Sequence, residues 1–194
     1  DETIDRVTDG SGLICEMTLA ELRFHFNKTH PEYKNATVPT LREVYELLKP
    51  YGLHVNVELK NSRIHYKGLE EKCIELAAEM GITDRIYYSS FNHYSLLHVK
   101  EIDKSLPCGI LYDATLIKPW EYAKKLGVDA IHPHFSELQI PGEPEATHAA
   151  GLEINTWTVN DEKDIINTIK WGADRIITNY PDRALALLKQ YGAN

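Results

Sequence analysis

The hydrophobic and polar positions of this chain repeat one unit, in which a helix closes at a glycine and a short apolar strand follows. Each closing glycine falls where a left-handed helix end needs no side chain, at Gly52, Gly81, Gly127, Gly151 and Gly172. The pattern predicts strands at residues 53–60, 85–90, 107–112, 128–133, 152–158 and 174–178. It predicts helices at residues 68–80, 92–104, 118–126, 143–150, 161–171 and 181–191.

Two further helices are predicted before the repeat begins. Thr18 and Glu21, and then Thr40 and Glu43, have the spacing of a capping box, and apolar residues follow each pair at helical intervals. The first twelve residues are polar and contain glycine, which predicts a loop.

Strands that alternate with helices predict parallel βαβ units with right-handed crossovers. Six such units fit an open doubly wound sheet or part of an eight-stranded α/β barrel, as one domain over residues 1–194. No Gly-x-Gly-x-x-Gly loop follows a strand, which weakens the prediction of a dinucleotide-binding fold. In both folds the functional residues gather at the carboxyl ends of the strands.

Those predicted strand ends carry polar and aromatic side chains, as the active-site face of a barrel should. They are Glu58 and Lys60, then Ser89, Ser90 and Phe91, then His132 and His134, then Trp157 and Asn160, then Thr178 and Asn179. Ser89 and Ser90 lack the Gly-x-Ser-x-Gly turn of serine hydrolases, which argues against that chemistry.

The run from Val55 to Lys60 is the strongest of these strand ends. Its apolar residues predict burial on both sides, yet Glu58 and Lys60, two residues apart, project to the same face. One interpretation is a metal-binding carboxylate beside a lysine that neutralises a phosphate. The other is a plain ion pair at the end of a strand, and the six residues alone leave both open.

Composition narrows the class of protein. The net charge of -8 argues against a general nucleic-acid binder, and no apolar run approaches the length of a membrane span. The three cysteines have no metal-binding spacing, and Cys73 and Cys108 are predicted to be buried free thiols. These features, with no signal peptide at the N-terminus, predict a cytoplasmic protein.

The ordered motifs of the chain resemble the glycerophosphodiester phosphodiesterases, a metal-dependent family of TIM barrels. The resemblance covers nearly the whole length and rests on six stretches, residues 1–12, 18–22 with 38–44, 56–60, 89–91, 154–160 and 177–182. Among them, Asn56-Val-Glu-Leu-Lys60 resembles the strand that carries a metal carboxylate and an active-site lysine in that family.

The resemblance implies metal-dependent hydrolysis of a small glycerophosphodiester to glycerol 3-phosphate and an alcohol. It implies that Glu58 is one carboxylate ligand of a calcium or magnesium ion and that Lys60 stabilises charge on the phosphate. Substrate-binding residues would be Phe91, His134, Trp157 and Asn160, with Trp157 as an apolar wall for the alcohol or headgroup.

The chain departs from the family pattern in its first part. The family's His-Arg-Gly strand, Glu-x-Asp strand and His-Asp pair do not occur, and six strands are predicted where a closed barrel needs eight. We therefore expect the 194-residue chain alone to be inactive, and we expect self-association through its open sheet edges. The alternatives are a non-catalytic barrel that binds phosphate or a small molecule, and a relative that cleaves lysophospholipid or sphingomyelin headgroups.

Only two histidines are candidates to replace the missing pair. His132 and His134 lie at one predicted strand end, although an ordinary His-Pro turn and a pocket-lining role explain them better. The remaining histidines are predicted to be surface or structural groups, at His25, His30, His54, His65, His93, His98 and His148.

Overall fold

A computed structural model describes residues 2–24, 26–29 and 31–192 of the chain. His25 and His30 lie outside the described residues, as does Asp1. The fold divides into two compact units, which are described separately. The prediction of one barrel domain over residues 1–194 stays a prediction.

The first unit comprises residues 1–55 and 60–85. It contains the α-helices α1 (Leu19–Phe24), α2 (Leu41–Leu48) and α3 (Leu69–Glu79), and the short 3-10 helices η1 (Ile14–Glu16), η2 (Pro31–Tyr33), η3 (Lys49–Tyr51) and η4 (Thr83–Arg85). Both predicted capping boxes are present. The Thr18 amide donates to Glu21 Oε2 at 2.7 Å, and the amide of Thr40 donates to Glu43 Oε2 at the same distance.

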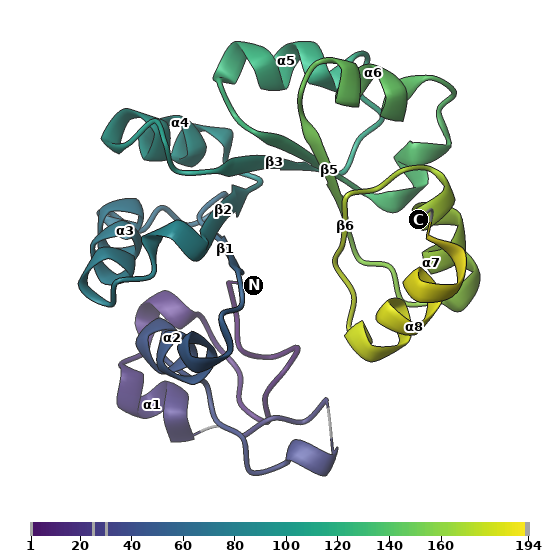
Figure 1. The fold of residues 1–194 in the computed structure, drawn as a ribbon. Coiled ribbons are helices and arrows are strands. Elements are labelled where there is room, and N and C mark those ends of the chain that lie inside the picture. Colours follow the sequence, from purple (N-terminus) through teal and green to yellow (C-terminus); the bar gives the residue numbers. More distant parts are fainter. Residues whose placement is uncertain (1, 25, 30, 193–194) are drawn as a thin grey trace. The chain divides into compact units, whose positions relative to one another are not determined.

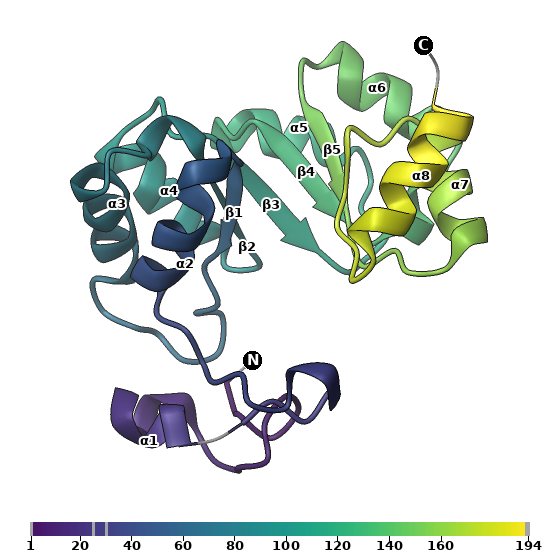
Figure 2. The same cartoon turned by 60° about the horizontal axis from the view of Figure 1, so that its bottom comes forward.

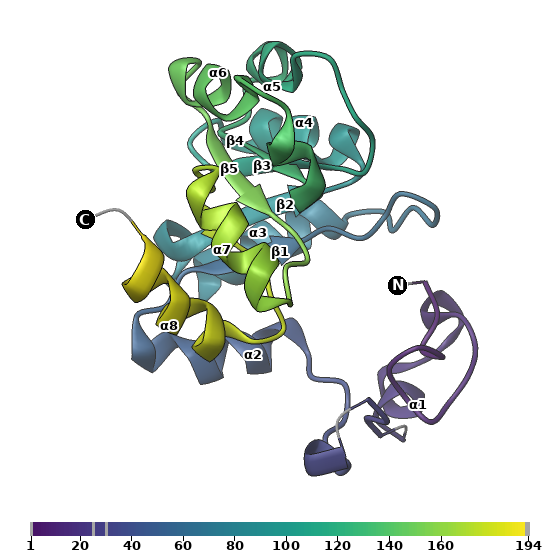
Figure 3. The same cartoon turned by 90° about the vertical axis from the view of Figure 1, so that its right-hand side faces the viewer.

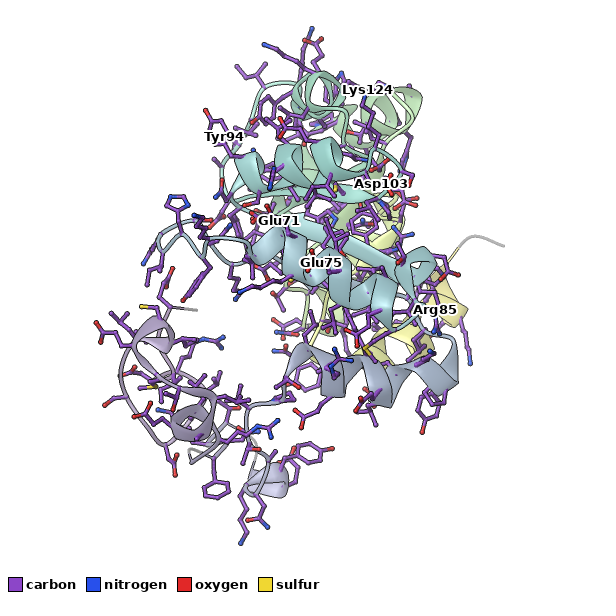
Figure 4. All side chains as sticks on the ribbon, turned by 90° about the vertical axis from the view of Figure 1, so that its left-hand side faces the viewer. Glu71, Glu75, Arg85, Tyr94, Asp103 and Lys124 are labelled. Atoms are coloured by element: carbon purple, nitrogen blue, oxygen red, sulfur yellow. The ribbon has the colours of Figure 1, made fainter. Side chains whose placement is uncertain are left out.

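Polar contacts join α2 to the end of α3 within this unit. Arg42 Nη2 donates to Glu79 Oε2 at 2.6 Å, and Lys49 Nζ donates to the carbonyl of Met80 at 2.6 Å. Figure 4 shows Glu71, Glu75 and Arg85 of this unit with their side chains. Cys73 is a buried free thiol in α3, as predicted, and burial raises its pKa to about 11, so it stays protonated.

The second unit comprises residues 56–59 and 86–194 and holds the sheet (Figure 1). The strands of the sheet are β1 (Val55–Glu58, of which Val55 counts with the first unit), β2 (Ile86–Ser90), β3 (Cys108–Tyr112), β4 (Ala130–Pro133), β5 (Glu153–Thr156) and β6 (Arg175–Ile176), in the spatial order β1-β2-β3-β4-β5-β6. Neighbouring strands from β2 to β6 all pair in parallel. The prediction of an α/β fold with six parallel barrel-type strands is therefore confirmed.

Helices alternate with these strands as predicted. They are α4 (His93–Ile102), α5 (Pro119–Leu126), α6 (Glu143–Ala149), α7 (Glu162–Lys170) and α8 (Pro181–Tyr191), with the 3-10 turn η5 (Phe135–Gln139) after β4. Figure 2 shows α4 and α5 behind the strands, and Figure 3 shows α7 and α8 side by side. The predicted closing glycines all have positive φ, from 63° at Gly81 to 87° at Gly172. Among the described residues, no helix is long and apolar enough to span a bilayer.

Side chains of the sheet divide between two faces. The face toward the helices is apolar and buries Ile110, Ile131 and Ile154 completely. The inner face, which points away from α4, α5 and α6, carries polar residues, including Tyr87, Ser89, His132, Asn155 and Arg175. Strand β1 differs from its prediction, because Val57 and Leu59 are buried while Asn56 and Glu58 are exposed. Only one side of this strand is covered.

Two aspartates fix the starts of the strands. Asp129 Oδ2 accepts from the Cys108 amide at 2.8 Å and from Lys100 Nζ at 2.7 Å. Asp174 Oδ2 accepts from the Ile154 amide at 2.8 Å and from His148 Nε2 at 2.9 Å. Each carboxylate therefore satisfies an amide at the beginning of the neighbouring strand, which fixes where that strand enters the sheet.

Gly109 lies on the inner face of β3, where neighbouring side chains leave no room for a Cβ. A Cβ there would lie 2.3 Å from His132 Nε2 and 3.0 Å from the Tyr87 hydroxyl. We predict that Gly109→Ala lowers the free energy of unfolding by about 1–3 kcal/mol, the usual cost of overpacking a core.

The measurement is urea unfolding of the single variants and of the double variant Gly109→Ala/His132→Ala. Because the alanine methyl would occupy space vacated by the imidazole, Gly109→Ala should cost less in the His132→Ala background. Equal costs in both backgrounds would contradict this explanation of the glycine.

Candidate active site at the carboxyl ends of the strands

Three aromatic side chains meet where β2, β4 and β5 end. Phe91 follows β2, His134 follows β4 and Trp157 follows β5. The ring centroids of Phe91 and Trp157 are 5.3 Å apart at an interplanar angle of 82°, and those of His134 and Trp157 are 5.5 Å apart at 83°. Both neighbours thus present an edge-to-face contact to the indole, an arrangement that aromatic quadrupoles favour.

The backbone holds this aromatic corner in register. His134 and Trp157 form a parallel bridge, and the Phe135 amide donates to the Trp157 carbonyl at 3.2 Å. The indole Nε1 of Trp157 donates to the carbonyl of His132 at 2.7 Å. Phe91 remains 42% exposed, so the corner is open to solvent while Trp157 is fixed by its own hydrogen bond.

His134 is oriented by the residues that follow it. Its Nδ1 lies 2.8 Å from Ser136 Oγ, and Ser136 Oγ lies 3.5 Å from Glu137 Oε1. With Nδ1 engaged by the serine hydroxyl, the imidazole is turned so that its ring packs on Phe135 as well as on Trp157.

His132 cannot serve as an acid or base at neutral pH. Its side chain is 2% exposed, and burial, with the positive charge of Arg175, lowers its pKa to about 3. The ring is stacked on Tyr87 with centroids 5.6 Å apart, and Nε2 lies 3.0 Å from Asn155 Nδ2. The imidazole is therefore a neutral part of the inner face, in line with a structural role.

Asn160 joins two loops at the ends of β5 and β6. Its side-chain oxygen accepts from the Asn179 amide at 2.9 Å and from Thr178 Oγ1 at 3.3 Å. Its backbone carbonyl accepts from Arg183 Nη1 at 3.3 Å. The carbonyl end of the amide is thus committed to the β6–α8 loop. Only its Nδ2 group is left as a donor toward a ligand.

Glu58 and Lys60 lie where the sequence places them. Glu58 is the last residue of β1 and is exposed, and Lys60 follows two residues later and is exposed as well. Ser90 Oγ, at the end of β2, donates to the Leu59 carbonyl at 2.6 Å and accepts from the Asn92 amide at 2.9 Å. This serine therefore ties β1 to β2 and is not available as a nucleophile.

A metal ion of the kind that the family resemblance implies needs several oxygen ligands. Within the described part of the chain, no group of three histidine, cysteine, aspartate or glutamate side chains could hold an ion. Glu58 offers a single carboxylate of the right chemistry. The described residues alone therefore do not supply a complete calcium or magnesium site.

Other histidines have structural contacts, as predicted. His93 Nε2 donates to the Leu111 carbonyl at 2.9 Å, and its Nδ1 lies 3.0 Å from the Tyr122 hydroxyl. His148 pairs with Asp174, while His54 and His65 are exposed. Tyr94, next to His93, is 83% exposed and extends from the start of α4 (Figure 4).

A hollow of about 310 Å³ lies at the opposite end of the strands. It is lined by Leu97, Lys100, Glu101, Lys104, Leu126 and Gly127. These residues come shortly before β3 and β4 begin, so the hollow is separate from the aromatic corner. The carboxyl ends of parallel strands remain the better candidate site.

Sequence reasoning missed a buried acidic group beneath the β4 loop. Glu143, the first residue of α6, is 5% exposed, and burial together with the nearby Glu137 carboxylate raises its pKa to about 7. Burial is also the main cause that raises the pKa of Tyr112, on the helix-facing side of β3, and the carboxylates of Glu143 and Glu137 add to it. The apolar periodicity of α6 could not reveal this, because Glu143 is polar by residue type.

We predict that this carboxyl makes the protein less stable as pH rises. Between the ordinary pKa of 4.5 and the folded value of about 7, the unfolded chain is ionised at Glu143 while the folded chain holds its proton. The free energy of unfolding therefore falls as pH rises through this window and reaches its full loss above it. The loss amounts to about 1.4 kcal/mol for each unit by which the folded pKa exceeds the unfolded one.

Urea unfolding of Glu143→Gln at pH 4.5 and pH 8 measures the effect. The variant should lose less stability than the wild type between these two pH values, and the exposed Glu145→Gln on the same helix serves as the control. The same loss in wild type and Glu143→Gln would show that Glu143 titrates normally.

Comparisons with known proteins show the family to which the chain belongs. The model of the glycerophosphoryl diester phosphodiesterase family matches residues 1–183. A glycerophosphodiester phosphodiesterase of Caldanaerobacter subterraneus is 35% identical over 99% of this chain and 79% of its own length. One of Bacillus altitudinis is 33% identical over 98% of this chain and 79% of its own.

A solved structure shares the fold. It is a phosphodiesterase of Oleispira antarctica in complex with the product sn-glycerol-3-phosphate, at 28% identity and a TM-score of 0.81. The match covers 97% of this chain and 77% of that one.

Proposed function

The chain belongs to the glycerophosphoryl diester phosphodiesterase family, and we propose that its strand ends bind a glycerophosphodiester for hydrolysis to glycerol 3-phosphate and an alcohol. The family match over residues 1–183 carries this proposal. The names of these relatives and the product bound in the Oleispira structure support the substrate class.

Lys60 provides positive charge for the phosphate in this proposal. An exposed ammonium two residues after β1 can approach a phosphate oxygen as a compact point charge. It would stabilise negative charge as the phosphorus–oxygen bond to the alcohol breaks. Its neighbour Glu58 would contribute one carboxylate to a divalent ion, calcium or magnesium. Such an ion needs further oxygen ligands besides Glu58.

The aromatic corner forms the apolar part of the site. Trp157 is fixed by its hydrogen bond to His132 O, and Phe91 and His134 pack edge-on against the indole. A fixed indole face would cover the carbon skeleton of the bound alcohol or glycerol and exclude water from it. Asn160 Nδ2 would donate to a substrate oxygen at the neighbouring loop.

We propose that the 194-residue chain by itself does not turn substrate over. One carboxylate does not hold a catalytic divalent ion, and the buried His132 stays neutral, so it cannot supply the acid and base. Release of glycerol 3-phosphate from glycerophosphocholine, with and without Ca²⁺ or Mg²⁺, is the measurement. Robust metal-dependent hydrolysis by a chain of verified mass would contradict this prediction.

Binding should survive without turnover. We predict that Lys60→Ala weakens the binding of glycerol 3-phosphate by about tenfold, which corresponds to about 1.4 kcal/mol for one lost charge contact. Calorimetric titration measures the dissociation constant, and the exposed Lys67→Ala serves as the control for net charge. Equal affinities for wild type and Lys60→Ala would remove Lys60 from the site.

A second candidate function follows from the incomplete ligand set. A barrel face with a lysine and an aromatic wall, but one metal carboxylate, suits a phosphate-binding protein without catalysis. The two functions differ in their response to chelator. Tighter binding with Ca²⁺ or Mg²⁺ favours the phosphodiesterase site, whereas affinity unchanged by chelator favours the non-catalytic binder.

A further inference from the structure

The inner face of the sheet contains a polar network directly beneath the aromatic corner. One residue comes from each of four strands, Tyr87 of β2, His132 of β4, Asn155 of β5 and Arg175 of β6. Each of the three residues Phe91, His134 and Trp157 stands further toward the carboxyl end of the same strands β2, β4 and β5. The network therefore lies next to the candidate site, on the amino-terminal side of the aromatic corner.

Each of the four residues contacts two others of the network. Asn155 Nδ2 lies 3.0 Å from His132 Nε2, and Arg175 Nη1 donates to Asn155 Oδ1 at 3.4 Å. The Arg175 guanidinium lies 5.6 Å from the centre of the Tyr87 ring, which in turn stacks on His132. Gly109, between them on β3, leaves the space into which the imidazole fits.

Hydrogen-bond chemistry then assigns the tautomer of His132. Because the oxygen of the Asn155 amide accepts from Arg175, the nitrogen of that amide faces His132 and must donate to Nε2. A neutral imidazole that accepts at Nε2 carries its proton at Nδ1. That Nδ1 is buried and has no hydrogen-bond partner among the described residues.

The network is joined to the site through one backbone atom. The carbonyl of His132 accepts the hydrogen bond from the Trp157 indole at 2.7 Å. A shift of His132 would therefore move the acceptor that fixes the indole, and with it the surface against which Phe91 and His134 pack.

We propose that Asn155 is a positioning residue: its hydrogen bond to Nε2 selects the neutral Nδ1–H tautomer of His132, and the same hydrogen bond fixes the imidazole and thereby the position of the Trp157 indole. Neither Asn155 nor His132 touches substrate in this proposal. The inference rests on the proposed function only in calling Trp157 a wall of the substrate site. Its test reads the protein without substrate, so it can fail independently of that function.

The first test is the ¹⁵N spectrum of the histidine side chains in the wild-type chain, with His132 assigned by His132→Gln. We expect a protonated Nδ1 and a bare Nε2 that do not change between pH 5 and pH 8, well above the folded pKa of about 3. A protonated Nε2, or titration within this range, would overturn the proposal, and His132→Gln serves only to assign the resonances.

The second test compares two substitutions of Asn155 through the indole resonances of the three tryptophans. Asn155→Leu keeps the approximate volume but removes both hydrogen bonds, so the Trp157 indole N–H should shift upfield as its hydrogen bond weakens. Asn155→Asp restores a bond of opposite direction, from His132 Nε2–H to the carboxylate. This variant should invert the tautomer and return the Trp157 resonance toward its wild-type position.

Controls separate positioning from general loosening of the sheet. Thr156→Val, at the next residue of β5, removes the buried hydrogen bond from Thr156 Oγ1 to the Pro133 carbonyl and leaves the network intact. Trp120 and Trp171 provide internal references in the same spectrum. An unmoved Trp157 in Asn155→Leu, or an equal shift in Thr156→Val, would overturn the positioning role.

Discussion

Parallel pairing of neighbouring strands is the constraint on which the candidate site depends. Because neighbouring strands from β2 to β6 all pair in parallel, the carboxyl ends of these strands share one edge of the sheet. Asp129 and Asp174 strengthen this arrangement by binding an amide at the start of a neighbouring strand. Residues far apart in sequence, such as Phe91 and Trp157, come into contact only because the strands begin in register.

The sequence predicts the elements well because their signals are local. Capping boxes at Thr18 and Thr40 and a left-handed glycine after each helix are properties of a few adjacent residues. The chemistry at the strand ends is also local, since a strand end is found by counting residues. For this reason Phe91, His134 and Trp157 could be named as candidates before their contacts were known.

Register and burial depend on more than adjacent residues, and there the sequence is less informative. The alternation of β1 between covered and exposed sides depends on which partner lies beneath it, so burial on both sides was wrong for this strand. The stacking of Tyr87 on His132 above Gly109 joins three different strands and has no sequence signature. Asn160 likewise stands at a strand end as predicted, although its side-chain oxygen is committed to the β6–α8 loop.

The structure assigns different tasks to the two faces of the sheet. The apolar face packs on the helices and supplies the core, while the polar inner face supports the aromatic corner from below. This division leaves the aromatic corner ordered by contacts within the sheet itself.

Amide and indole chemical-shift mapping with sn-glycerol 3-phosphate tests most directly whether the strand ends are the ligand site. The account predicts that the resonances which move belong to the carboxyl ends of the strands, with Phe91, His134 and Trp157 among them. Movement confined to the hollow around Leu97 and Leu126, at the other end of the strands, would contradict it.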